Sequence, residues 1–168
     1  MLPRLDFAKI DAMDALDLAI LIEIEAMERY KYFSQSLGHT GGNDATSVFR
    51  MMVDAEGKHG EELAARRKQL FGTAPTRVHR DMVWDAEAPE EGSIRWGMSQ
   101  LKALQICLAA EHKAFNYYDE AIPFVTNPEV VELFKGLRDE ETQHVQLLEG
   151  IIAKLPPEAD MELEDLDD

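Results

Sequence analysis

Two short segments of the chain repeat the pattern D-x-E-x-x-H, and each places a glutamate one helical turn before a histidine. The first copy contains Glu56 and His59, and the second contains Glu141 and His144. Residues three apart lie on the same face of an α-helix, so each pair can direct a carboxylate and an imidazole to one point. One such match in a glutamate-rich chain is expected by chance, but two matches on apolar helix faces favour a shared site.

Two further glutamates, Glu23 and Glu111, also lie on predicted helices, with apolar or small residues at the neighbouring helical positions. Burying four carboxylates at one level costs several kcal/mol for each unless the charge is compensated. Two divalent cations balance the negative charge of four carboxylates, and two neutral imidazoles complete the ligand set. That set takes one glutamate from each of two helices and one E-x-x-H pair from each of the other two. Oxygen and imidazole ligands suit iron or manganese, and zinc is also possible. A plain helical bundle with coincidentally placed glutamates and histidines is the alternative.

Tyr30 and Tyr118 add a second regularity, because each lies seven residues after one of the two single glutamates. Their hydroxyl groups could hydrogen-bond the carboxylates of the site and fix their orientation. They could equally be aromatic core residues that donate to other acceptors. The sequence leaves both interpretations open.

Helical periodicity predicts four long helices over about residues 11–37, 44–71, 97–124 and 128–155. Residues 73–96 have no sustained period and contain Pro75, Pro89, Trp84 and Trp96, which indicates a long connection. The pattern predicts an all-α four-helix bundle with one long crossover between the second and third helices. We expect residues 1–157 to form this domain, and the acidic residues 158–168 to form a disordered tail.

Composition restricts the partners of the chain. The 168 residues carry 17 basic and 33 acidic side chains, a formal net charge of −16, which argues against binding to nucleic acid or to anionic membranes. The one cysteine, Cys107, excludes an intrachain disulfide and a C-x-x-C motif. Apolar runs are far shorter than the roughly 20 residues that a membrane helix needs. We therefore expect a soluble cytoplasmic protein.

The motif residues resemble those of the ferritin-like superfamily over nearly all of residues 11–155, and the segment EIEAMERYKYF around Glu23 is most similar to rubrerythrins. This resemblance implies a ferritin-like bundle with a non-haem diiron centre. It implies that Glu23 and His59 bind one iron, that Glu111 and His144 bind the other, and that Glu56 and Glu141 bridge them. Three features differ from relatives: Ala114 stands where rubrerythrins usually carry another glutamate, Gly57 replaces the haem-binding methionine of bacterioferritins, and no rubredoxin-like C-x-x-C motifs are present.

The resemblance implies an oxidoreductase, a diiron peroxidase or ferroxidase that reduces H2O2 or O2, oxidises Fe²⁺, or does both in oxidative-stress or iron handling. Its reactive residues would be Glu23, Glu56, Glu111, Glu141, Tyr30 and Tyr118. The expected cofactor is two iron ions without haem, and the electrons would come from an external rubredoxin-like protein or reductase. We also expect a homodimer. The alternatives are a ferritin-type iron-storage protein and a metal-free structural or interaction bundle.

Overall fold

The computed structural model describes residues 11–37, 44–82 and 97–161 of the chain, and these contain four long helices. The helices are α1 (Ala12–Leu37), α2 (Asp44–Phe71), α3 (Gln100–Ala121) and α4 (Pro128–Ile152). Three short 3-10 helices accompany them: η3 (Arg80–Met82), η4 (Ile122–Phe124) and η5 (Pro157–Asp160). No β-strand occurs in the described ranges. The prediction of an all-α four-helix bundle is confirmed.

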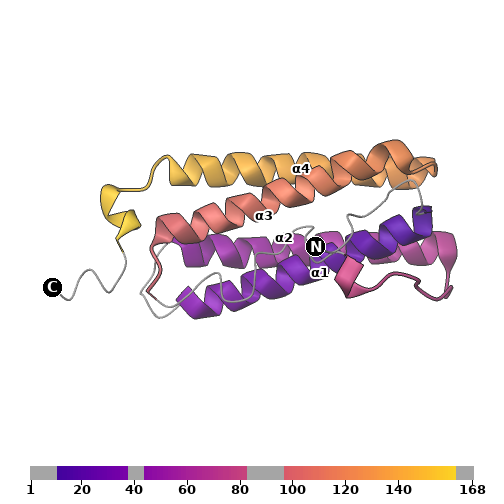
Figure 1. The fold of residues 1–168 in the computed structure, drawn as a ribbon, viewed down its shortest axis with the longest axis horizontal. Coiled ribbons are helices and arrows are strands. Elements are labelled where there is room, and N and C mark those ends of the chain that lie inside the picture. The colour runs from indigo at the N-terminus through magenta and orange to yellow at the C-terminus, as the bar shows by residue number, and fades with distance from the viewer. Residues whose placement is uncertain (1–10, 38–43, 83–96, 162–168) are drawn as a thin grey trace.

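The four helices lie alongside one another along the length of the molecule (Figure 1). Following the colours of Figure 1 along the chain, α1 and α2 run in opposite directions, as do α3 and α4, whereas α2 and α3 run in the same direction. A parallel pair cannot be joined by a tight turn, because the chain must return along the bundle. The topology therefore explains the long stretch between Phe71 and Gln100.

The helix ends follow local chemistry. Asn127 caps α4, since its side chain accepts hydrogen bonds from the backbone N–H groups of Glu129 and Val130, and Pro128 occupies the first helical turn. The third helix begins at Gln100, slightly later than predicted, because Ser99 caps it by accepting from Lys102 N at 3.2 Å. Gly97 precedes this cap with a φ of 80°, a conformation outside the helix.

The end of α2 is tied to α1 through Arg67. Its guanidinium donates to Asp17 Oδ1 at 2.8 Å and Oδ2 at 3.2 Å, and also to the backbone carbonyls of Gly72 and Ala74. Gly72 has a φ of 58°, the left-handed conformation that commonly ends a helix. Arg67 thus fixes the point at which the chain leaves α2.

The core consists of two apolar clusters at different levels of the bundle. One contains Leu16, Ile22 and Leu63 with Phe134, and the other contains Phe33, Phe49, Met52, Leu104 and Leu148. On α2 the sequence passes from Met52 in one cluster to Leu63 in the other. The glutamate and histidine of the first motif lie between these two residues, so a polar layer separates the two halves of the core.

The expected tail needs a correction at its start. α4 ends at Ile152, before the two prolines at which the sequence predicted its end, and Pro157–Asp160 form η5, in which Ala159 is buried. Residues 162–168 lie outside the described residues, as do Trp84 and Trp96, on which the expectation of a dimer depended. In the described part of the chain, no helix has the length and apolar character needed to cross a membrane.

Candidate metal centre

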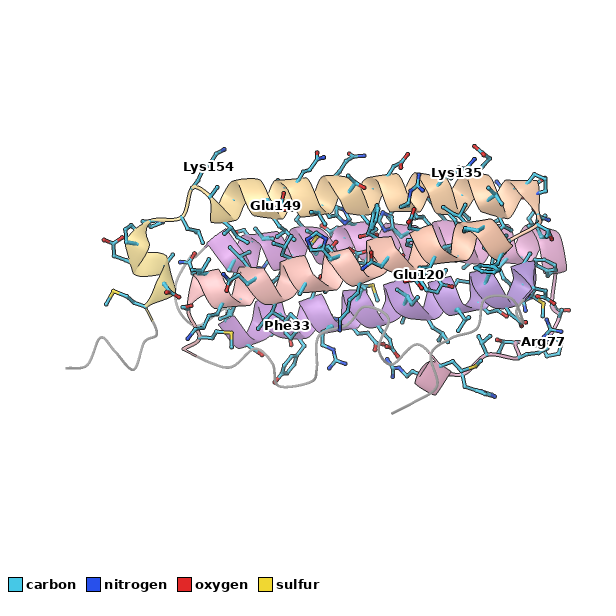
Figure 2. The ribbon with its side chains drawn as sticks, turned by 45° about the horizontal axis from the view of Figure 1, so that its top comes forward. Phe33, Arg77, Glu120, Lys135, Glu149 and Lys154 are labelled. Atoms are coloured by element: carbon cyan, nitrogen blue, oxygen red, sulfur yellow. The ribbon has the colours of Figure 1, made fainter. Side chains whose placement is uncertain are left out.

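The structure brings the six predicted ligand residues together at the middle of the bundle, one glutamate each from α1 and α3 and one E-x-x-H pair each from α2 and α4. Glu23, Glu56, Glu111 and Glu141 are fully buried. The His59 side chain is 1% exposed and the His144 side chain 15%. Figure 2 shows side chains filling the space between the helices, while Lys135 and Lys154 point outward from the α4 side of the molecule.

These residues form two overlapping groups, each able to offer four ligand atoms that all lie within 4.8 Å of one another. The first group is Glu23, Glu56, His59 and Glu141, and the second is Glu56, Glu111, Glu141 and His144. Only the α2 and α4 glutamates belong to both groups. This arrangement suits two adjacent cations that share two carboxylates.

Both imidazoles direct Nδ1 toward the carboxylates. His59 Nδ1 lies 3.3 Å from Glu23 Oε2, 3.2 Å from Glu56 Oε2 and 3.7 Å from Glu141 Oε1. The two rings are stacked, with centroids 5.7 Å apart and planes inclined by 18°. Each ring therefore offers one nitrogen to the interior of the site and keeps the other away from it.

On the α4 side, His144 Nδ1 lies 2.9 Å from Glu111 Oε2, 3.6 Å from Glu56 Oε1 and 3.4 Å from Glu141 Oε2. The same two shared glutamates thus face both imidazoles. Each single glutamate faces only the imidazole of its own group. The site has an approximate two-fold symmetry that relates the α1–α2 hairpin to the α3–α4 hairpin.

The carboxylates of Glu56 and Glu141 are the least satisfied polar groups in the described part of the chain. None of their four buried oxygens has a hydrogen-bond partner there. An unpaired buried acceptor costs about 1–3 kcal/mol, and more when it is charged. Two buried carboxylates without donors, facing two imidazole nitrogens, are what a metal site without its ions would present. The residues present therefore fit a pair of divalent cations.

The electrostatics of the metal-free site agree with this interpretation. Burial raises the pKa of Glu56 well above its usual value, and the neighbouring Glu141, Glu23 and Glu111 raise it further. Burial likewise raises the pKa of Glu141. These carboxyl groups resist ionisation because negative charge is concentrated in a dry space.

The pKa values of both histidines are raised, which favours the charged imidazolium forms. Burial acts to lower the pKa of His59, but the hydrogen bond to Glu23 and the nearby negative charge of Glu23 and Glu56 outweigh it and raise that pKa to about 12. The pKa of His144 is also raised. Burial again acts to lower it, and the hydrogen bond to Glu111 is the largest of the effects that raise it. Protons on the imidazoles therefore offset part of the negative charge of the surrounding glutamates.

The two tyrosines hydrogen-bond the single glutamates crosswise. Tyr30 on α1 donates to Glu111 Oε1 on α3, and Tyr118 on α3 donates to Glu23 Oε1 on α1. Seven residues span about 10.5 Å along a helix, too far to reach the glutamate of the same helix. The antiparallel packing of α1 against α3 brings each hydroxyl beside the opposite glutamate. Burial raises the pKa of Tyr30 well above its usual value, which keeps this hydroxyl a donor.

One residue that contacts the site, Glu140, is not predicted by the sequence pattern. Glu140, next to Glu141 on α4, lies with its Oε2 2.7 Å from His59 Nε2. In the sequence it is one glutamate in the acidic run D-E-E, and a position adjacent to Glu141 falls about 100° away on the helix. Only the packing of α2 against α4 shows that this direction points to the outer nitrogen of His59.

The fold and the site define an all-α ferritin-like bundle with a buried glutamate and histidine cluster that can hold metal ions. The rubrerythrin family model matches residues 14–152. The chain therefore belongs to the rubrerythrin family.

Solved structures share this fold. An uncharacterised conserved protein from Magnetospirillum magnetotacticum MS-1 is 30% identical with a TM-score of 0.71, and the match covers 86% of this chain and 95% of that one. A hypothetical protein from Pyrococcus furiosus is 20% identical with a TM-score of 0.67, over 91% of this chain and 95% of that one. A dodecameric, bacterioferritin-related thioferritin from Bacteroides fragilis is 21% identical with a TM-score of 0.63, over 89% and 88% of the two chains. Among curated protein sequences, none matches this chain.

Proposed function

We propose that the chain is a non-haem diiron oxidoreductase that reduces H2O2 or O2, with its own reduced centre or added Fe²⁺ as the source of electrons. The observation that carries this proposal is the group of four buried carboxylate oxygens without hydrogen-bond donors on Glu56 and Glu141. A structural role would leave such oxygens paired. Membership of the rubrerythrin family supports iron as the metal, and manganese or zinc would suit the same ligands.

The six residues take distinct roles in this proposal. Glu23 and His59 would hold one ion, Glu111 and His144 the other, and Glu56 and Glu141 would bridge them, as their membership of both ligand groups suggests. When bound, two ferrous ions supply the two electrons that convert H2O2 and two protons to two molecules of water. The chain places its ligands on four helices, so the geometry is preorganised.

The surrounding residues would keep the site in one arrangement. The hydroxyls of Tyr30 and Tyr118 donate to Glu111 and Glu23, which fixes the rotation of these carboxylates and leaves Glu23 Oε2 and Glu111 Oε2 facing the histidines. The two apolar clusters above and below the layer limit access of water. Because Cys107 is the one cysteine of the chain, re-reduction would depend on an external donor such as a rubredoxin-like protein or a reductase.

The test is anaerobic titration with Fe²⁺, followed by absorption and Mössbauer spectroscopy after addition of H2O2 or O2. We expect two irons per chain and an oxidation that consumes one H2O2 for each pair. Glu56→Gln removes a shared ligand and should abolish stoichiometric binding, whereas Glu149→Gln, an exposed residue on the same helix as Glu141, should bind and react normally. Absence of bound iron or manganese after anaerobic loading would overturn the proposal.

The oligomeric state separates this enzyme from an iron store. We propose a homodimer, whereas the thioferritin relative is dodecameric, and mineral storage needs a hollow shell. Light scattering coupled to size-exclusion chromatography gives the mass directly. A large closed assembly that takes up many irons per chain would favour storage over redox catalysis.

A further inference from the structure

The two halves of the site differ at the outer nitrogens of the histidines. His59 Nε2 lies 2.7 Å from Glu140 Oε2, and Glu140 is the residue immediately before the shared Glu141. At the corresponding place before the shared Glu56 stands Ala55, which has no side-chain acceptor. In the described part of the chain, His144 Nε2 has no hydrogen-bond partner. The symmetry of the ligands is thus broken just outside them.

The two histidine side chains also differ in their exposure to solvent. The His59 side chain is 1% exposed, and the His144 side chain is 15% exposed. By the approximate symmetry of the site Ala55 corresponds to Glu140, and its methyl group covers less of a neighbouring ring than a glutamate side chain does. The position formed by Glu111 and His144 is therefore closer to solvent and has the less constrained imidazole.

From this asymmetry we infer that Glu140 is a positioning residue that makes the two metal positions inequivalent. The Glu23–His59 position binds a divalent cation more tightly, and the Glu111–His144 position is the one that fills last and exchanges first. The inference rests on the proposed dimetal site and adds an order of occupation to it.

The physical reason is the hydrogen bond on the far side of the ring. A carboxylate that accepts from Nε2–H holds the neutral imidazole in the tautomer whose Nδ1 lone pair faces the site, and it makes that nitrogen more basic. Losing such a partner typically lowers metal affinity about 10–100-fold. The Glu140 side chain is 41% exposed, so water screens its charge and the lower end of this range, about 10-fold, applies.

The experiment is a titration with Co²⁺, followed by visible absorption and by calorimetry, on the full chain. The wild type should bind two Co²⁺ in two steps whose affinities differ about 10-fold or more. Glu140→Ala should weaken the first step about 10-fold and leave the second nearly unchanged, so that the steps merge. Glu140→Gln, whose amide oxygen can still accept from Nε2–H, should restore part of the separation. Ala55→Glu should strengthen the second step.

Asp139→Ala is the matched control. It removes one acidic charge from the adjacent position, where the side chain is 69% exposed and lies 3.6 Å from Arg138. If the affinity depended only on nearby negative charge, Asp139→Ala and Glu140→Ala would weaken binding alike. The inference requires that the control change neither step by more than about two-fold, because a charge that is 69% exposed is screened by solvent and, in the described part of the chain, contacts neither histidine.

A second measurement reports the hydrogen bond itself. In the Zn²⁺-loaded protein, long-range ¹H–¹⁵N spectra should show a slowly exchanging Nε2–H for His59 in the wild type and in Glu140→Gln. That signal should exchange rapidly in Glu140→Ala and remain in Asp139→Ala. Two equal Co²⁺ steps in the wild type, or equal weakening of both steps by Glu140→Ala, would overturn the inference and leave the dimetal proposal standing. Failure of the wild type to bind Co²⁺, Fe²⁺ or Mn²⁺ would overturn both.

Discussion

Replacing the buried Glu56 with glutamine should make the metal-free protein more stable near neutral pH while destroying its metal site. Glu56 is fully buried, and neither of its carboxylate oxygens has a hydrogen-bond donor among the described residues. Its folded-state pKa is raised, first by burial and then by the surrounding carboxylates. A group with a raised folded pKa favours folding below its ordinary pKa and opposes it increasingly as the pH rises. A neutral amide of the same shape removes that penalty.

The size of the effect follows from the distance between pH 7 and the ordinary carboxyl pKa of 4.5. At roughly 1.4 kcal/mol per pH unit, this interval limits the penalty to about 3 kcal/mol. Part of it is offset by the contact with His59, 3.2 Å away, which the variant weakens. We therefore expect a gain of about 1–3 kcal/mol at pH 7, or roughly 2–10 °C in Tm for a domain of this size, and almost none at pH 4.5.

The assay is chemical denaturation in EDTA at pH 4.5 and pH 7, followed by circular dichroism, and then the same measurement with Mn²⁺. Glu149→Gln changes an exposed carboxylate in α4 and should leave stability unchanged within about 0.5 kcal/mol. Mn²⁺ should stabilise the wild type and this control but not Glu56→Gln. If Glu56→Gln were destabilised equally at both pH values, the carboxylate would be a structural hydrogen-bonding group, and our reasoning about the site would be wrong.

Three further outcomes follow from the same structure. The free energy of unfolding of the metal-free wild type should fall as the pH rises above about 4.5. Burial raises the folded-state pKa of both Glu56 and Glu141, so the folded state binds more protons than the unfolded state. Urea unfolding in EDTA from pH 4.5 to 9 measures this, and a free energy of unfolding that rises with pH would contradict it. Tyr118→Phe should lower the free energy of unfolding by about 1–3 kcal/mol, because Glu23 Oε1 loses its buried hydrogen-bond donor. Thermal unfolding of the metal-free protein measures this decrease. Arg67→Ala should lower the free energy of unfolding by about 2–4 kcal/mol because it leaves the mostly buried Asp17 unpaired. Lys135→Ala, which breaks an exposed contact with Glu132, should lower it by less than about 1 kcal/mol.

The fold was predictable because capping and helix-ending residues mark several of the helix boundaries. Gly72 follows α2 and Asn127 caps α4, so these two ends agree with the predicted boundaries at residues 71 and 128, and the apolar period identifies the faces that pack. The start of α3 was predicted too early, at Gly97 or Met98, because the apolar period does not show that Ser99 is the residue that caps the helix. The short helix η5 could not be foreseen, since its one buried residue is an alanine in an acidic segment.

The six residues of the candidate metal centre were predictable for a different reason. Their types and spacing are set by coordination chemistry within single helices, so they can be found without knowing how the helices pack. Contacts between helices carry no such signal. The crosswise bonds of Tyr30 and Tyr118 depend on the antiparallel arrangement of α1 and α3, and the role of Glu140 depends on the rotation of α4 against α2. Periodicity along one helix fixes neither of these.

The position of the site also links metal binding to stability. The glutamate layer lies between two apolar clusters, so each half of the core packs largely without it, and we expect the metal-free chain to fold. Yet the layer itself opposes folding when it is ionised, because its shared carboxylates have no donors. Cations that bind only the folded chain stabilise it by an amount that grows with their affinity, and they displace the protons that the carboxyls and imidazoles otherwise keep.

Metal binding should therefore release protons at neutral pH, and calorimetry in two buffers of different ionisation enthalpy would detect them. A titration without proton release would mean that the carboxyls are already ionised in the metal-free protein, contrary to what their burial and mutual repulsion require.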